Sequence, residues 1–325
     1  MKANVVVAQS VGHVELQERE VADPSAGEVQ VRVNVSLISP GTERAFILAM
    51  PNTRGKFPFE PGYASAGVVE KVGPGVERLV PGDRVGCYLL GHRSVGNVAE
   101  QWAVKMPGNV LFEHACFISL AETSQQGVRK ARIDLGERVL VLGLGLVGQL
   151  AVLVSRLCGA APVVAVDRVR KRLEIARQVG ADEVVDATQD DWYEHLAARP
   201  DVVIESTGVP EAITPALKAV RDLGRVILLG STRGESTVNF YADVHRRGAT
   251  VIGAHATGSV PKHESRPGNW TWADEAQCFV TMLQYGRMAL DPLITHRIPW
   301  NKAPDIYREI LDWKSDPLGV ILQWE

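Results

Sequence analysis

The sequence predicts an α/β protein in which a doubly wound parallel sheet is joined to a separate β-rich domain. A chain of 325 residues is long enough to close two hydrophobic cores. Residues 1–115 alternate between apolar and polar side chains, as strands do, with Gly, Pro and Asp at the turns. Residues 120–255 instead alternate near-continuous apolar strands with amphipathic helices, which is typical of a parallel sheet covered on both faces.

The last part of the chain returns to a mixed pattern. It predicts a helix near residues 273–285, an extended stretch "DPLITHRI", a short helix near residues 306–311 and a closing strand "GVILQW". We expect this part to rejoin the first domain, so that residues 1–118 and 266–325 form one discontinuous domain. Residues 119–265 then form the parallel-sheet domain.

The composition argues against several classes of partner. The formal net charge is −3 and charges of both signs are mixed along the chain, so no field of one sign attracts nucleic acid or an anionic membrane. We find neither a signal peptide nor an apolar run of membrane-spanning length, and therefore expect a cytoplasmic protein. The cysteines form no CxxC pair, and we expect four reduced core thiols: Cys87, Cys116, Cys158 and Cys278.

A glycine-rich turn follows the apolar stretch "RVLVL" and precedes a helical pattern. Gly143, Gly145 and Gly148 have the spacing G-x-G-x-x-G in the strand-turn-helix context that this motif requires. Gly143 permits a tight turn, Gly145 leaves room for a pyrophosphate, and Gly148 lets the helix approach the strand. The amides of Leu146 and Val147 then face the phosphates at the helix N-terminus. The segment predicts a Rossmann-type dinucleotide site.

An acidic residue favours NAD as the cofactor. Asp167 ends the second strand, about 20 residues beyond the last glycine, where a carboxylate accepts hydrogen bonds from the adenosine ribose. A carboxylate there also repels a 2′-phosphate, so we expect NAD rather than NADP. Arg168 and Arg172 follow, and they either soften that exclusion or lie on a solvated helix face. Later strands end at four more residues expected to line the cofactor: Ser206, Thr207, Gly208 and Gly230.

The run "PGYASAGVVEKVGPGV…PGDRVG", the nucleotide-binding segment and "LDPLITHRI" together resemble the medium-chain dehydrogenase/reductase superfamily over essentially the whole chain. The resemblance implies a Rossmann domain and a β-rich, GroES-like catalytic domain. It places the catalytic zinc ligands of the alcohol and polyol dehydrogenases at Pro40, Tyr63 and Ser119, which supply no thiolate, imidazole or carboxylate. The cysteines of the family's structural zinc lobe are missing too. We therefore expect no metal, as in a zinc-less branch that includes bacteriochlorophyllide, sugar and cyclitol dehydrogenases.

A dehydrogenase without zinc must move the substrate proton with its own side chains. Tyr63 stands where the family has a histidine ligand, and its phenol either handles that proton or fills the space of the metal. Thr42 matches a proton-relaying hydroxyl of the family. Glu43 follows it and is either catalytic or a structural partner of Arg44 or Arg84.

Three further features are candidates for the substrate site. Glu122 precedes Thr123, which the resemblance places near the nicotinamide; burial raises the pKa of a carboxyl, although an acid at a helix N-terminus is the simpler interpretation. His92 lies in a loop that borders the substrate or is simply solvated. The long segment 254–273 carries Trp270 and Trp272, whose faces suit a polyhydroxylated ring; a surface cover or a dimer contact is the alternative.

These observations predict a zinc-independent, NAD-dependent oxidoreductase that interconverts a secondary alcohol and a ketone on a polyol, sugar or cyclitol. Two alternatives stay open: a zinc-less quinone or enoyl reductase, and a catalytically silent protein that binds NAD. The strand "ATVIGA" indicates edge-to-edge pairing in a homodimer.

Overall fold

The computed structural model describes residues 1–313 and 316–324 and divides into two compact units. Unit 1 comprises Met1–Ser119 and Ala276–Glu325, and unit 2 comprises Leu120–Glu275. We expected boundaries at 118/119 and 265/266; each observed boundary lies inside a helix, α3 (Ile118–Ala131) or α7 (Trp272–Gln284). Residues 314, 315 and 325, which we assigned to the first domain, lie outside the described residues.

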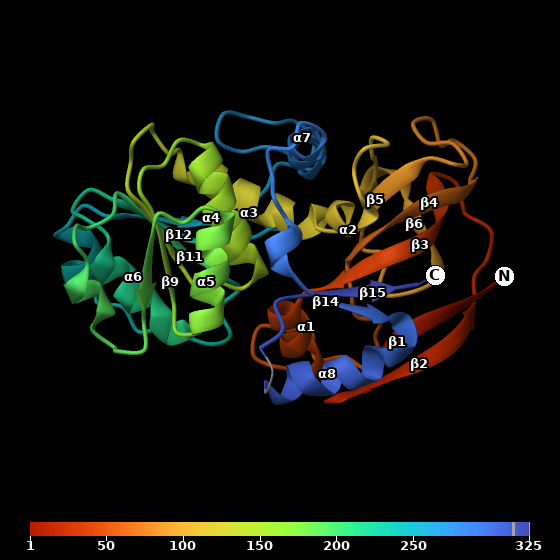
Figure 1. The fold of residues 1–325 in the computed structure, drawn as a ribbon, viewed down its shortest axis with the longest axis horizontal. Helices are drawn as coiled ribbons and strands as arrows, with labels where there is room; N and C mark the ends of the chain where they lie inside the picture. The colour runs from red at the N-terminus through yellow and green to blue at the C-terminus, as the bar shows by residue number, and fades with distance from the viewer. Residues whose placement is uncertain (314–315, 325) are drawn as a thin grey trace. The chain divides into compact units, whose positions relative to one another are not determined.

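Unit 1 is built mainly from antiparallel strands (Figure 1). Its larger sheet has the order β14-β15-β3-β4-β5-β7, with β6 paired to β3, while β1 and β2 form a separate hairpin. The strands are β1 (Lys2–Ser10), β2 (His13–Glu20), β3 (Glu28–Ile38), β4 (Ala64–Val72), β5 (Arg84–Tyr88), β6 (Val95–Ala99), β7 (Ala103–Lys105), β14 (Ile294–Pro299) and β15 (Gly319–Gln323). The helical segments are α1 (Pro40–Ile47), η1 (Glu100–Trp102), α2 (Phe112–Ala115), η5 (Asp291–Leu293), η6 (Trp300–Lys302) and α8 (Ala303–Asp312).

Helix α1 of unit 1 was not predicted from the sequence pattern, which is dominated by strands. It begins at Pro40, a position where proline costs no helical hydrogen bond, and it is only 8 residues long. A helix of two turns between strands gives a weak periodic signal, so the sequence predicts a β-rich region here. The helix carries both Thr42 and Glu43.

Unit 2 contains a six-stranded parallel sheet with the order β10-β9-β8-β11-β12-β13. This order is that of a doubly wound Rossmann sheet, in which β9 and β10 lie on one side of β8 and the later strands, beginning with β11, lie on the other. The strands are β8 (Val139–Leu142), β9 (Val163–Asp167), β10 (Glu183–Asp186), β11 (Val202–Glu205), β12 (Arg225–Leu228) and β13 (Thr250–Gly253). The helical segments are α4 (Leu146–Leu157), α5 (Arg170–Val179), η2 (Trp192–His195), η3 (Pro210–Ala212), α6 (Ile213–Ala219) and η4 (Phe240–His245).

The predicted fold class is confirmed by this sheet and its helices. Strands β8, β9 and β11 are buried along their whole length, as near-continuous apolar strands predict. Helices α4 and α5 pack side by side against this sheet (Figure 1). The stretch "DWYEHLAA" between β10 and β11 contains only the short turn η2.

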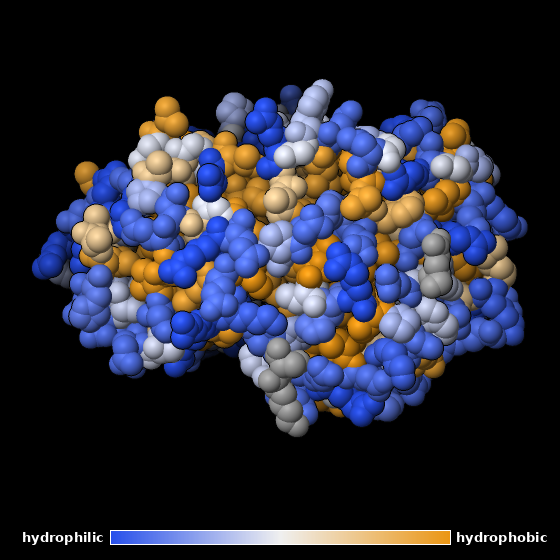
Figure 2. Space-filling model, in the orientation of Figure 1, coloured by the Kyte–Doolittle hydropathy of each residue, from blue (hydrophilic) through white to orange (hydrophobic). Residues whose placement is uncertain are grey.

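The surface is mostly polar on the visible face of both units, with hydrophobic residues showing between the polar ones (Figure 2). No helix within the described residues is long and apolar enough to cross a membrane. All four cysteines are free; Cys87 and Cys116 are buried, but Cys158 is exposed, so its assignment to the core was wrong. Its position at the end of α4, where the helix meets solvent, explains the difference.

Candidate functional site

The glycine-rich turn of unit 2 lies between β8 and α4. Gly143 has a φ of +89°, and a Cβ atom there would lie 2.7 Å from Thr207 Cγ2. A Cβ atom on Gly148 would lie 1.9 Å from the carbonyl oxygen of Gly143, so helix and turn touch backbone to backbone. Around Gly145, no described atom apart from its chain neighbours lies within 4 Å of such a Cβ. This open position next to the first amides of α4, those of Leu146 and Val147, fits the pyrophosphate of a dinucleotide.

Asp167 ends β9 and is 8% exposed. Its carboxylate accepts hydrogen bonds from the amides of Leu144 at 2.6 Å and Val169 at 2.8 Å. A carboxylate has more acceptor positions than these two bonds use, so capacity for ribose hydroxyls remains. Arg172 Nη1 lies 3.9 Å from Asp167 Oδ2, whereas Arg168 is exposed. Of the two arginines, Arg172 is the one that faces the carboxylate.

A buried carboxylate that the sequence analysis missed fixes the turn after β11. Glu205 is fully buried, and its Oε1 accepts hydrogen bonds from the Thr207 amide, at 2.7 Å, and from the Thr207 hydroxyl. Burial raises the pKa of the Glu205 carboxyl. A carboxylate at the end of an otherwise apolar strand, "DVVIES", was the available signal.

The residues that we expected to line the cofactor lie together around this turn. Ser206 Oγ donates a hydrogen bond to the Gly143 carbonyl oxygen at 2.6 Å. A Cβ atom on Gly230 would lie 2.6 Å from the Gly208 nitrogen and 3.0 Å from the Thr207 nitrogen. The turns after β8, β11 and β12 therefore meet at one edge of the sheet, where a Rossmann sheet binds its cofactor.

In unit 1, Tyr63 lies directly before β4. Its ring contacts Tyr88 edge to face, with centroids 6.1 Å apart and planes at 87°. Ser119 Oγ donates a hydrogen bond to the Tyr63 carbonyl oxygen at 3.0 Å, so two of the three positions assigned to zinc ligands are in direct contact. A proline, a phenol and this engaged hydroxyl do not fit a zinc ion. The described residues also contain no group of three or more His, Cys, Asp or Glu side chains that could hold a metal.

Glu43 and His92 form a buried pair in unit 1. Glu43 is 3% exposed, His92 is 0% exposed, and His92 Nε2 lies 3.1 Å from Glu43 Oε2. The hydroxyl of Tyr307 donates to the same oxygen, and burial raises the pKa of this phenol. The sequence offered no local signal for Tyr307, since it lies on α8, far along the chain from Glu43.

These contacts correct two expectations. The guanidinium groups of Arg44 and Arg84 bond to backbone carbonyl oxygens, so neither is the partner of Glu43 within the described residues. His92 is not solvated, because its ring is fully buried. Thr42, beside Glu43 on α1, is half-buried.

Glu122 lies on α3 beyond the first turn and is 1% exposed, so it is not an acid at a helix N-terminus. Desolvation, and next the charge of Glu275, raise the pKa of Glu122 to about 8. Its Oε2 accepts a weak hydrogen bond from Thr123 Oγ1 at 3.4 Å, and its Oε1 has no hydrogen-bond partner among the described residues. A buried carboxyl with this pKa is able to gain or lose a proton near neutral pH.

The segment after β13 is bound to α3 by polar contacts within unit 2. Arg129 donates hydrogen bonds to the buried Glu275 at 2.6 and 2.9 Å, and its guanidinium carbon lies 3.5 Å from the centre of the Trp270 ring. Lys130 Nζ donates to the Ser259 carbonyl oxygen at 2.7 Å. Trp270 therefore stacks with a cation of the protein itself. Trp272 is only 6% exposed, so little of its ring faces solvent.

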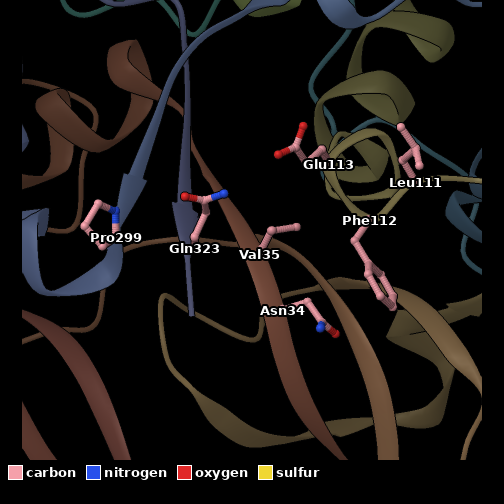
Figure 3. A pocket seen from close by; sticks show the side chains of 7 residues that line it. All are labelled: Asn34, Val35, Leu111, Phe112, Glu113, Pro299 and Gln323. Atoms are coloured by element: carbon pink, nitrogen blue, oxygen red, sulfur yellow. The ribbon is translucent and has the colours of Figure 1, made fainter. Parts of the chain in front are cut away.

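An open pocket of about 370 Å³ lies in unit 1 (Figure 3). The carboxylate of Glu113 at this pocket forms an ion pair with Arg297 at 2.8 Å. None of the predicted site residues lines this pocket. Its lining consists of Asn34, Val35, Leu111, Phe112, Glu113, Pro299 and Gln323.

Comparisons with known proteins agree with both halves of this description. The family model for zinc-binding dehydrogenases matches residues 147–273, and the model for the alcohol dehydrogenase GroES-like domain matches residues 25–108. The chain is 30% identical to L-threonine 3-dehydrogenase from Pyrococcus horikoshii, with 92% of this chain and 91% of that protein covered. It is 26% identical to sorbitol dehydrogenase from Homo sapiens, with 93% and 91% covered.

Solved structures share the fold over almost the whole chain. A zinc-binding dehydrogenase structure from Sinorhizobium meliloti, bound to NADP, has a TM-score of 0.85 at 22% identity, with 99% of both chains covered. An alcohol dehydrogenase from Escherichia coli, complexed with NADH, has a TM-score of 0.85 at 20% identity and the same coverage. The expected two-domain fold is thereby confirmed, and structures of this fold bind either nicotinamide dinucleotide.

Proposed function

Because the chain belongs to the medium-chain dehydrogenase/reductase family, we propose that it is an NAD-dependent oxidoreductase that interconverts a secondary alcohol and a ketone without zinc. The alcohol and polyol dehydrogenase type follows from the family and from relatives named sorbitol dehydrogenase and L-threonine 3-dehydrogenase. The observation that carries the cofactor is the open space at Gly145 beside the first turn of α4.

NAD is preferred over NADP because of Asp167. A 2′-phosphate on the adenosine ribose would meet a carboxylate that already accepts two backbone hydrogen bonds and is held in place by them. Arg172 lies 3.9 Å from this carboxylate and partly neutralises it, so some use of NADP is expected. We therefore predict that the protein prefers NAD to NADP but does not exclude NADP completely.

The nicotinamide, when bound, supplies the chemistry of hydride transfer. The residues of the chain must stabilise charge on the substrate oxygen and carry its proton. The Tyr63 phenol is the proposed hydrogen-bond donor to this oxygen, and the Thr42 hydroxyl is the proposed relay. Glu122, whose pKa is about 8, is the proposed acceptor of the proton when an alcohol is oxidised. Glu43 is not assigned to this chemistry, because its carboxylate is engaged in the buried pair with His92.

The absence of zinc is supported by the side chains at Pro40, Tyr63 and Ser119. A catalytic zinc ion polarises the alcohol oxygen and is itself held by thiolate, imidazole or carboxylate ligands. These three side chains offer none of those ligands. The Ser119 hydroxyl is also directed to the Tyr63 carbonyl oxygen.

A substrate panel tests the proposal. The purified full chain is incubated with NAD or NADP and a set of polyols, sugars, cyclitols and L-threonine, and formation of the reduced cofactor is followed by absorbance. We expect a polyol, sugar or cyclitol to reduce NAD with a higher kcat/KM than NADP. Tyr63→Phe should lower kcat by roughly 10²- to 10⁴-fold, the usual contribution of an acid-base group. Tyr285→Phe, at an exposed tyrosine, is the matched control and should have no effect.

Two results would contradict the proposal. Reduction of quinones or activated double bonds with NADPH, unaffected by Tyr63→Phe, would indicate a C=C reductase. Tight binding of NADH with no turnover of any compound of the panel would indicate a protein that binds the cofactor without catalysis.

A homodimer is proposed from the edge of the parallel sheet. β13 is the last strand of that sheet, and Thr250, Val251 and Gly253 on it are exposed. An exposed strand edge is a template for pairing with a second copy. Sedimentation velocity of the full chain tests this, with a dimer expected for the native chain and a monomer for Val251→Pro.

A further inference from the structure

Three separate segments of unit 1 contain the positions assigned to zinc ligands. They are the start of α1 with Pro40, the turn with Tyr63, and the start of α3 with Ser119. In an enzyme with a catalytic zinc, one ion bonded to all three segments holds them together. Since these side chains do not fit the ion, other contacts must fix the segments. This inference rests on the proposed zinc-free function.

The first contact involves the start of α1. Glu43 Oε1 accepts a hydrogen bond from the Ser39 amide at 2.8 Å, so the carboxylate closes the first turn of its own helix. Glu43 Oε2 accepts from His92 Nε2 at 3.1 Å and from the Tyr307 hydroxyl. Because Glu43 is 3% exposed, these donors take the place of water, and a charge-assisted bond of this kind is stronger than a neutral one.

The second contact joins His92 to the turn before Tyr63. The His92 amide donates to the Pro61 carbonyl oxygen at 3.0 Å. Gly62 has a φ of +93°, and a Cβ atom there would lie 2.5 Å from the imidazole carbon Cδ2. The ring therefore lies directly against the backbone of Gly62, and only glycine permits both the dihedral angle and this approach.

The third contact joins the same turn to α3. The carbonyl oxygen of Tyr63 accepts hydrogen bonds from Ser119 Oγ at 3.0 Å and from the Leu89 amide at 3.1 Å. Ser119 is 2% exposed, so its hydroxyl is removed from competing water. The backbone of Tyr63 is thereby held by α3 and by the residue that follows β5, while His92 holds it through Gly62.

The hydrogen bonds around His92 are satisfied together by one protonation state. The Trp324 indole nitrogen donates to Ser36 Oγ at 2.9 Å, and Ser36 Oγ lies 2.8 Å from His92 Nδ1. If the Ser36 hydroxyl donates to Nδ1, a neutral imidazole with its proton on Nε2 donates to the Glu43 carboxylate. Each of these buried donors then has an acceptor, as buried polar groups require.

We propose that Glu43, His92 and Ser119 are positioning residues that replace the cross-link of a zinc ion by hydrogen bonds. Glu43 and His92 join the start of α1 to the Tyr63 turn, and Ser119 joins that turn to α3. Their function is to keep the Tyr63 phenol in one orientation for catalysis. None of them exchanges a proton with the substrate.

The experiment observes Tyr63 directly and needs no substrate. The full chain is produced with 3-fluorotyrosine and studied by ¹⁹F NMR in the presence of NADH. The chain contains 6 tyrosines, and the resonance that disappears in Tyr63→Phe is that of residue 63. In the wild type we expect one narrow resonance for this ring. In Ser119→Ala and in His92→Gln we expect it to broaden or split, because more than one orientation is then populated.

A matched control separates positioning from general loss of stability. Val98→Ala removes buried volume from the hydrophobic core that also contains Tyr307. It removes none of the hydrogen bonds made by Glu43, His92 and Ser119, and should leave the Tyr63 resonance narrow. An unchanged Tyr63 resonance in Ser119→Ala and His92→Gln overturns the inference. If His92→Gln does not fold, Ser119→Ala alone decides.

Kinetics distinguish this inference from the proposed function. If Tyr63 acts in catalysis and these residues position it, Ser119→Ala introduced into the wild-type chain should lower kcat at nearly unchanged KM. The same substitution introduced into the Tyr63→Phe variant should have little further effect on kcat. Losses that multiply independently overturn the positioning role. A Tyr63→Phe variant with full turnover overturns the catalytic assignment instead, while the NMR result still decides whether the residues order the ring.

Discussion

Glu122 has a raised pKa because its carboxyl is buried on α3 beside the charge of Glu275. The pKa is about 8 in the folded chain, whereas an unperturbed glutamate has a pKa of 4.5. Between these values the folded chain binds a proton that the unfolded chain does not, so the free energy of unfolding falls as the pH rises from about 4.5 to about 8. Since one pKa unit corresponds to about 1.4 kcal/mol, the total fall from this group is at most about 5 kcal/mol.

Glu122→Gln should remove this pH dependence. The variant keeps the shape of the protonated acid, so we expect it to match the wild type near pH 4.5 and to be more stable near pH 8, by a few kcal/mol. Urea unfolding across this pH range measures the difference, and Glu211→Gln, at an exposed position, is the control. A stability difference that does not change with pH would show that Glu122 is not protonated in the folded chain at neutral pH.

Glu205 is the residue through which the cofactor edge of unit 2 is best tested. It holds the Thr207 amide and hydroxyl, and Thr207 in turn contacts Gly143. Glu205→Ala leaves these donors without their acceptor, and an unsatisfied buried donor costs about 1–3 kcal/mol. We expect the dissociation constant of NADH, measured by fluorescence titration, to rise roughly tenfold or more. Equal NADH affinity for Glu205→Ala and the wild type would contradict this role.

At the scale of elements, two glycines in the strand-turn-helix formed by β8 and α4 allow effects on NADH binding to be distinguished from effects on folding. Gly145 has room for a methyl group and a φ of −65°, which any residue adopts, whereas a Cβ on Gly148 would collide with the Gly143 carbonyl oxygen. Gly145→Ala should therefore fold with nearly unchanged Tm and bind NADH at least tenfold more weakly. Gly148→Ala should lower the Tm itself by several degrees, because helix and turn must separate.

Thermal unfolding and NADH titration of the two variants check this pair. If Gly145→Ala binds NADH as tightly as the wild type, the open position does not hold the pyrophosphate. If Gly148→Ala leaves the Tm unchanged, the close approach of helix and turn is not required for folding.

The same strand-turn-helix shows which features can be predicted from residues that are close together in the sequence. The glycine spacing and Asp167 lie within one strand-helix-strand segment, so their spacing alone predicts the turn that the structure shows. The Glu43–His92–Tyr307 network joins three distant parts of the chain, and nothing local marks a tyrosine on α8 as the partner of a glutamate on α1. Helix α1 was missed for a related reason, since its 8 residues give too short a period.

For the whole molecule, the change from alternating strands to strands and helices predicts both domains, because each pattern reflects how one type of sheet is buried. The return of the last residues to the first unit is also readable, since β15 completes the sheet beside β3. The prediction that no zinc is bound depends on three separate segments of the chain. Residues 40, 63 and 119 are far apart in the sequence, and only the family resemblance assigns them to one site.

The metal content of active protein is the most direct measurement. The full chain, purified without added metal and shown to oxidise a polyol with NAD, is analysed for zinc by mass spectrometry and assayed before and after dialysis against a strong chelator. We expect far less than one zinc per chain and unchanged kcat after dialysis, because side chains of the protein carry the substrate proton. One zinc per chain, with turnover lost on chelation and restored by zinc, would contradict a metal-free mechanism.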